Sequence, residues 1–210
     1  TIRQIVPHIH CALFSPDGKY IFATDFSADR ILRFTLSSEG NISRLPGEAI
    51  DIAPDSGPRH LTFSPNGKFA YLINELSGKV ITFGYTDGTL EQIQSIAADS
   101  LQARGSADIH LSPDGKFLYA SNRLEGDGIA IFTVDTVNGT LTRAGYQPTG
   151  IHPRHFNITP NGKYLLAACR DSNVIQVYER DTENGLLRDT QQDILIDKPV
   201  CVQFIPPFHN

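Results

Sequence analysis

Methionine and tryptophan are absent from the 210 residues, and cysteine occurs only three times, as Cys11, Cys169 and Cys201. These cysteines lie far apart and form no Cys-x-x-Cys pair, so their odd number favours reduced thiols over a disulfide framework. No apolar run reaches the length of about 18 residues that a membrane-spanning helix needs. We therefore expect a cytoplasmic protein without a membrane partner. Because the chain begins at Thr1, we expect the natural N-terminus, with any signal peptide, to lie upstream.

An excess of positive charge is also missing. Lysine and arginine number 18 against 23 aspartates and glutamates, which gives a net charge of -5. This balance excludes a nucleic-acid partner held by a basic surface, although a local arginine cluster could still bind a small anion. The sequence has no Gly-x-Ser-x-Gly elbow, Walker loop or Gly-x-Gly-x-x-Gly motif. That absence disfavours a serine hydrolase, an NTPase and a Rossmann dehydrogenase.

A four-residue turn motif recurs along the chain. It first occurs at 15–18 (SPDG) and returns at 64–67 (SPNG), 112–115 (SPDG) and 159–162 (TPNG). The spacing is about 48 residues, which indicates an internal structural repeat. Proline at the second position, followed by Asp-Gly or Asn-Gly, supplies the backbone angles of a tight hairpin turn.

Each repeat is predicted to contain four short strands, because apolar and β-branched runs alternate with glycine-rich turns and no long helical period occurs. Four antiparallel strands in about 48 residues predict a blade of an all-β propeller. An immunoglobulin-like sandwich has no such period. We expect about four blades of a larger ring in a single domain. The predicted division is 1–6 (end of a preceding blade), 7–50, 57–98, 105–146 and 152–193 (four blades), and 194–210 (closing strand and tail).

Two positions of every blade are expected to meet at one end of the propeller, because a hairpin places the start of its first strand beside the end of its second. The positions before the turn hold His10-Cys11, Arg59-His60, Ala107-Asp108 and Arg154-His155. The positions after it hold Asp25-Phe26, Asn74-Glu75, Asn122-Arg123 and Cys169-Arg170. The turn is kept from repeat to repeat whereas these residues vary, which predicts a ligand site at this rim.

The charge of the rim indicates the class of ligand. Four arginines facing one funnel would repel each other without an anion to receive them. A phosphate or carboxylate ligand is therefore favoured. The alternative is structural, because buried histidine, aspartate or arginine side chains can join neighbouring blades by hydrogen bonds.

Several histidines raise the question of a metal ion. His8 and His10 are two residues apart and would share one face of a strand. His152 and His155 flank Pro153-Arg154 in a comparable way. No third ligand is evident beside His8 and His10, so metal catalysis is disfavoured. His110 lies in an apolar stretch and is expected to be a core residue.

The rim motifs occur in a distinctive order: 7–10 (PHIH), 57–60 (GPRH), 72–75 (LINE), 107–110 (ADIH) and 120–123 (ASNR). Together they resemble the seven-bladed lactonase propellers, a family that includes the bacterial propeller-type 6-phosphogluconolactonases and the fungal carboxy-muconate cyclase. The resemblance covers essentially the whole chain and implies the C-terminal four blades of a seven-bladed ring. The phosphogluconolactonase branch is the most similar. It implies hydrolysis of 6-phosphogluconolactone to 6-phosphogluconate in the pentose phosphate pathway.

The resemblance also implies roles for individual residues. The motif matches make His10, Arg59, Glu75 and Arg123 the implied catalytic residues. Their rim neighbours are implied to bind the substrate: His8, His60, Asn74, Asp108, Asn122, Arg154, His155 and Arg170. The pair Cys169-Arg170 departs from the Asn-Gln expected in many relatives, which leaves the choice of substrate open.

A mechanism follows as a hypothesis. Glu75 or His10 would take a proton from water. Arg59 and Arg123 would hold the developing oxyanion or, helped by other arginines, the substrate phosphate. The expected ligand is a small anionic sugar lactone, with no metal and no organic cofactor.

Two other functions are compatible with the same pattern. The propeller could be a binding module without catalysis, but its rim of His, Arg, Glu and Asp without tryptophan favours an enzyme. It could also catalyse the lactonisation of a carboxylated muconate, which would use the same arginines. The sequence does not indicate an oligomeric state.

Overall fold

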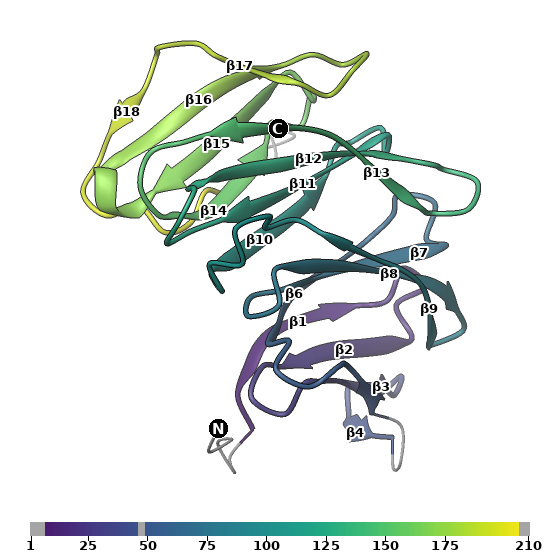
Figure 1. The fold of residues 1–210 in the computed structure, drawn as a ribbon. Helices are drawn as coiled ribbons and strands as arrows, with labels where there is room; N and C mark the ends of the chain where they lie inside the picture. The colour runs from purple at the N-terminus through teal and green to yellow at the C-terminus, as the bar shows by residue number, and fades with distance from the viewer. Residues whose placement is uncertain (1–6, 46–48, 206–210) are drawn as a thin grey trace.

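The computed structural model describes residues 7–45 and 49–205 and arranges them as antiparallel sheets, one after another along the chain (Figure 1). The predicted all-β propeller class is confirmed. Helical structure in these ranges is limited to one short 3-10 turn, η1 (Arg170–Ser172). No helix among the described residues has the length and apolar character needed to cross a membrane. The strand predicted for residues 1–6 lies outside the described ranges.

The first two sheets occupy residues 9–97. The first contains β1 (Ile9–Phe14), β2 (Tyr20–Asp25), β3 (Arg30–Leu36), β4 (Ile42–Arg44) and β5 (Ile50–Asp51). Its strands β1 to β4 lie in chain order, and β5 also pairs with β3. The second contains β6 (Pro58–Phe63), β7 (Phe69–Asn74), β8 (Lys79–Thr86) and β9 (Thr89–Ala97), also in chain order.

The other two sheets occupy residues 106–195. The third contains β10 (Ser106–Leu111), β11 (Phe117–Asn122), β12 (Gly128–Val134) and β13 (Leu141–Pro148). The fourth contains β14 (Pro153–Ile158), β15 (Tyr164–Cys169), β16 (Val174–Arg180), β17 (Leu187–Asp189) and β18 (Ile194–Leu195). Here β18 adds to β16 beside β17. Three of the four sheets extend one or two residues beyond the blade ends predicted from the sequence, at 51, 148 and 195.

The repeated turn motif forms the same hydrogen bonds in every sheet. In the first, the N–H of Gly18 donates to the carbonyl of Ser15, and the Ser15 hydroxyl accepts from the N–H of Tyr20 at 3.0 Å. The same bonds recur in the turns at 64, 112 and 159. Gly18 has a φ of 71°, which glycine adopts without steric cost. The motif therefore sets the hairpin that joins the first two strands of each sheet.

The apolar core lies between the sheets. Each of three buried clusters is shared by two neighbouring sheets, as in the pairs Phe22 and Leu72, Tyr71 and Leu118, and Tyr119 and Phe156. The Tyr119 hydroxyl also donates to the carbonyl of Gly185 in the next sheet at 2.7 Å. Figure 1 shows the sheets stacked in this order. This face-to-face packing holds the sheets at fixed positions and so fixes the rim that they share.

The segment after the fourth sheet differs from a regular strand. A closing strand and tail were predicted for residues 194–210; β18 covers only 194–195, and no strand is present at 199–204. Instead, the N–H of Val202 donates to Nδ1 of His155 at 3.2 Å, and its carbonyl accepts from Asn157 at 3.1 Å. The first strand of a sheet pairs with the second strand of its hairpin. Residues 206–210, which follow this segment, lie outside the described ranges.

Candidate active site

The first strands of neighbouring sheets lie next to one another: β1 contacts β6, β6 contacts β10, and β10 contacts β14. Their N-terminal ends carry the histidines and arginines predicted for the rim. The second strands end at the same edge, where Glu75 follows β7 and Arg123 follows β11. The rim residues of different sheets therefore meet in one region.

Every first strand has a β-bulge at its rim end. The pairing with the second strand skips His10, Arg59 and Arg154, and it shifts between Ser106 and Ile109 in the third sheet. A bulge inserts an extra residue and re-aims side chains, and bulges are common beside active sites. In a regular strand, Arg59 and His60 would point to opposite faces. The bulge brings Arg59 Nη1 within 3.4 Å of His60 Nε2.

Glu75 lies between two arginines of different sheets. Its Oε2 accepts from Nε of Arg59 at 2.8 Å, and its Oε1 lies 3.0 Å from Nη2 of Arg123. The arginine side chains are 2% and 6% exposed, whereas Glu75 is 23% exposed. Burial and the charge of Arg123 lower the pKa of Arg59 to about 10. This Arg–Glu–Arg clamp therefore holds two desolvated guanidinium groups beside one carboxylate.

Each arginine of the clamp contacts a histidine, and that histidine in turn contacts an aspartate. On one side, His60 Nδ1 lies 2.6 Å from Oδ1 of Asp108, and the His60 Nε2 faces Arg59. The aspartate accepts the proton of Nδ1, which leaves the Nε2 lone pair free of hydrogen. We call Asp108, His60 and Arg59 the buried arm, because the Asp108 side chain is only 3% exposed.

The other side repeats the pattern with residues of the third and fourth sheets. His152 Nδ1 lies 3.2 Å from Oδ2 of Asp171, and its Nε2 lies 3.2 Å from Nη1 of Arg123. Burial, followed by the charges of Arg123 and Arg170, lowers the pKa of His152, which is therefore neutral near pH 7. We call Asp171, His152 and Arg123 the exposed arm, because the Asp171 side chain is 38% exposed. Both arms end on Glu75.

His10 brings the first sheet into the site. Its ring centroid lies 5.0 Å from that of His60, and its buried Nδ1 has no hydrogen-bond partner among the described residues. Burial, followed by the charges of Arg59 and His60, lowers its pKa to about 3. His10 is therefore a neutral and weakly basic imidazole at neutral pH.

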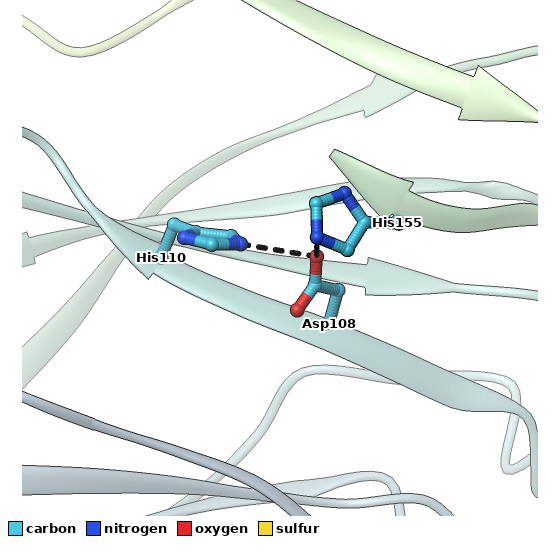
Figure 2. A group of neighbouring side chains, drawn as sticks. All are labelled: Asp108, His110 and His155. Atoms are coloured by element: carbon cyan, nitrogen blue, oxygen red, sulfur yellow. Dashed lines mark hydrogen bonds and ion pairs between the residues drawn. The ribbon is translucent and has the colours of Figure 1, made fainter. Parts of the chain in front are cut away.

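Asp108 also organises His110 and His155, as Figure 2 shows. Its Oδ2 lies 3.1 Å from Nε2 of His110 and 3.6 Å from Nε2 of His155, and the three ligand atoms lie within 4.8 Å of one another. Burial would raise the pKa of Asp108, but His110 and His60 hold it well below its usual value. Two imidazoles and one carboxylate form a set of ligands of the kind that binds metal ions in proteins.

The hydrogen bonds around this group fit a metal poorly. The Asp108 carboxylate accepts from the N–H groups of Ile109 and Phe156 in addition to the histidines. His155 Nδ1 accepts from the N–H of Val202, so the neutral ring carries its proton on Nε2, the atom that faces Asp108. A metal ligand needs a free lone pair at that nitrogen. The Asp108 carboxylate is therefore saturated by hydrogen-bond donors of the protein.

The remaining rim arginines differ in their partners. Arg170 pairs with Asp171 at 2.7 Å. Arg154 is half-buried and makes no ion pair with any residue in the described ranges. Its charge lowers the pKa values of His10, Arg59 and Arg123, which come from three different sheets. Arg154 therefore provides a cation without an ion-pair partner among the described residues, close enough to affect rim residues of three sheets.

Comparison with known proteins identifies the family. Residues 1–204 match the family described as "Lactonase, 7-bladed beta-propeller". This chain belongs to that family. A 6-phosphogluconolactonase of Formosa agariphila is 42% identical over 99% of the chain, and one of Klebsiella pneumoniae is 38% identical over 90%. The chain spans 60% and 58% of the lengths of these two relatives.

Solved structures of the lactonase family are also similar. A candidate 6-phosphogluconolactonase from Bacteroides uniformis is 74% identical, with a TM-score of 0.95 over 97% of this chain and 60% of its own. A periplasmic gluconolactonase from Pseudomonas aeruginosa is 34% identical, with a TM-score of 0.91 over 98% and 59% of the two chains. The resemblance inferred from the rim motifs is thus confirmed at the level of the family.

Some predicted site residues of this lactonase-family chain lie elsewhere. His8 is exposed and packs on Phe26, whereas His10 faces His60, so the two do not form a metal pair. The bulge at His10 breaks the strand alternation on which that expectation rested. Carboxylates of the chain itself reduce the expected repulsion among the four rim arginines, because Arg59, Arg123 and Arg170 each have a carboxylate partner.

Asn74 and Asn122 are better described as structural residues than as substrate ligands. Both are fully buried. The Asn74 amide donates to the carbonyl of Lys79 at 3.1 Å. The Asn122 amide donates to the carbonyl of Ala98 at 3.0 Å and accepts from the Ser106 hydroxyl at 2.6 Å. These bonds hold the ends of the second strands, and so position the residues that follow them.

Two histidines were not among the predicted site residues. His152 lies in the loop before β14 with a φ of 62°, a left-handed conformation that is uncommon outside glycine. His110, expected in the core, is half-buried against Asp108 and Phe156. The spacing from Asp108 to His110 places both on one strand face, which is the only sequence signal for the second.

Proposed function

We propose that this rim is part of the active site of a lactonase that hydrolyses a small anionic sugar lactone, with 6-phosphogluconolactone as the favoured substrate. The Arg–Glu–Arg clamp at Glu75, with Arg154 that has no ion pair in the described part of the chain, supports this proposal most strongly. The clamp offers desolvated cations for a developing oxyanion, and Arg154 offers a charge for a second anionic group. The names of the two bacterial relatives agree with this chemistry.

Arg59 and Arg123 are suited to the reacting carbonyl. Water attack on a lactone carbonyl places negative charge on its oxygen, and preorganised donors at that point lower the barrier. Both guanidinium groups are held by Glu75 and by backbone carbonyls, of Ala107 for Arg59 and Gly105 for Arg123. They are too deeply buried to surround a bulky phosphate dianion. We therefore assign them to the oxyanion.

Arg154 is suited to the substrate phosphate. It is half-buried, has no internal carboxylate partner among the described residues, and lies where residues of three sheets feel its charge. An arginine fork binds phosphate oxygens in a bidentate manner. His155, its neighbour on β14, is held by Asp108 and Val202, which favours a positioning role over direct phosphate binding.

We also propose that the reaction needs no metal ion, because the donors around Asp108 occupy the lone pairs that a metal would need. Chelation with EDTA is then expected to leave the rate unchanged, and a loss restored by a divalent cation would contradict this.

The three cysteines Cys11, Cys169 and Cys201 are free thiols, which supports a reducing, cytoplasmic location.

The test follows acid release from 6-phosphogluconolactone by titration at constant pH, with the full chain and against the spontaneous rate. We expect a rate well above the spontaneous one. Replacement of Arg154 by glutamine is expected to raise KM for the phosphorylated lactone far more than for gluconolactone. Arg188→Gln is the matched control, because Arg188 is exposed and pairs with Glu179 on the outer edge of the fourth sheet. A wild-type rate equal to the spontaneous rate would contradict the proposal.

A further inference from the structure

We propose that His60 is the general base that activates the attacking water, and that Asp108 positions it. This inference rests on the proposed lactone hydrolysis and names the proton acceptor of that reaction. The two groups suggested by the sequence for this role were Glu75 and His10. The contacts of both make them poor candidates.

Glu75 is occupied by the arginine clamp. Each of its carboxylate oxygens already lies within 3.0 Å of an arginine nitrogen. A water molecule that approaches Glu75 would compete with two charged donors for the same lone pairs. Its geometry fits a residue that holds Arg59 and Arg123 in place.

His10 is weak as a proton acceptor for a different reason. It is surrounded by Arg59, Arg154 and His60, and burial together with these neighbours lowers its pKa to about 3. A general base works best when its pKa lies near the working pH. A neutral His10 can still donate or accept a hydrogen bond to the substrate.

His60 has the geometry that a base requires. Its Nδ1 is 2.6 Å from a buried aspartate, which fixes the tautomer and the orientation of the ring. The Nε2 lone pair then faces Arg59, the residue assigned to the oxyanion, at 3.4 Å from Nη1. The His60 side chain is 24% exposed, so water and substrate can reach it. This is the arrangement of a carboxylate that orients a histidine base.

The exposed arm shows what distinguishes a base from a supporting histidine. His152 has the same Asp–His–Arg order, but its side chain is 11% exposed and its Nε2 lies 3.2 Å from Arg123. The shorter contact and the lower exposure of His152 favour a role in holding Arg123. His60 lies farther from its arginine and is more accessible.

The water oxygen forms a bond to the lactone carbonyl carbon while one water proton passes to Nε2 of His60. The carbonyl oxygen becomes an oxyanion beside the clamp. When the ring C–O bond breaks, the protonated His60 returns the proton to the leaving ring oxygen, which becomes a hydroxyl group. The product is the open-chain hydroxy acid, and no oxidant, reductant or metal is consumed.

The first test compares two substitutions of His60 in the full chain. Asparagine places an amide N–H near the position of Nδ1, so His60→Asn keeps a donor for Asp108 but removes the acceptor at Nε2. We expect kcat to fall by ~10²–10⁴-fold, the range typical of general acid–base groups, with a much smaller change in KM. His60→Ala is expected to lose a similar factor and to regain activity when free imidazole is added.

The control is Arg188→Gln, because Arg188 is exposed and pairs with Glu179 on the outer edge of the fourth sheet. This variant is expected to retain kcat within a few fold. Full kcat in His60→Asn, or an effect confined to KM, would overturn the proposal for His60. A His60→Ala variant that folds like the wild type and shows no response to imidazole would do the same. The wild-type rate above the spontaneous rate decides the proposed function separately.

Discussion

The buried arm and the exposed arm use the same three residue types to reach one carboxylate, yet they differ in where their aspartates lie. Asp108 is almost fully buried and accepts bonds from three sheets, whereas Asp171 is open to solvent and is shared with Arg170. Their histidines differ in the opposite sense, because His60 is more exposed than His152.

The same Asp–His–Arg pattern therefore serves a different purpose in each arm. A buried aspartate can fix an accessible histidine strongly, because a charged hydrogen bond is weakened little by solvent in the interior. A solvent-exposed aspartate contributes less, so the buried His152 depends mainly on its own packing and on Arg123. The buried arm is thus suited to proton transfer, and the exposed arm to holding Arg123.

The largest effect is expected where the two arms meet. Glu75→Gln removes the charge that both arginines share and leaves two buried guanidinium groups without a counterion. Breaking a buried ion pair costs about 3–5 kcal/mol of stability, and we expect activity to fall by ~10²–10⁴-fold as the oxyanion site loses its order. Enzyme assays and urea unfolding of the full chain measure both effects. Unchanged activity with unchanged stability would contradict the role of the clamp.

The second prediction separates the arms by their aspartates. Asp108→Asn is expected to lower the free energy of unfolding by about 3 kcal/mol or more, because several buried donors lose a charged acceptor. Asp171→Asn is expected to lower the free energy of unfolding far less, since an exposed ion pair is screened by water. Urea unfolding of the two variants beside the wild type provides the measurement. Equal losses would show that burial does not distinguish the arms.

The third prediction concerns pH. The pKa of His10 falls from 6.5 to about 3 on folding. Below pH 6.5 the unfolded chain therefore takes up a proton at His10 that the native state does not. The free energy of unfolding is expected to decrease as the pH falls from about 6.5 towards 3. Below about pH 4, the lowered pKa of Asp108 adds a loss of the same sign.

His10→Gln isolates the contribution of the first of these groups. The variant cannot take up that proton, so its stability is expected to change less between about pH 7 and about pH 5 than that of the wild type. Unfolding midpoints at the two pH values provide the comparison. Parallel pH profiles for the variant and the wild type would show that His10 is not held neutral by the fold.

The repeating architecture could be predicted from the sequence because its signal is local. The turn motif at 15–18 and its three copies determine a hairpin through their own backbone and side-chain bonds. The start of one strand and the end of the next must then share an edge. This is why Arg59, Glu75 and Arg123 could be placed at one rim before the structure was known.

The pairing of the rim residues could not be predicted, because it depends on contacts between sheets and on the bulges. The bulge at Arg59 lets neighbouring residues face the same region, and nothing in a two-residue period indicates it. The saturation of Asp108 involves β6, β10 and β14, and the left-handed φ of His152 depends on its loop. These features decide which charges are neutralised and which histidine remains accessible.

The most direct test of the account is a crystal structure of the full chain with the product 6-phosphogluconate bound. We expect the product carboxylate within hydrogen-bonding distance of Arg59 or Arg123, the hydroxyl released from the ring donating to His60 Nε2, and the phosphate on Arg154. Product bound away from this rim, for example in the groove beside β15 and β16 lined by Tyr164, Leu166 and Val177, would contradict it.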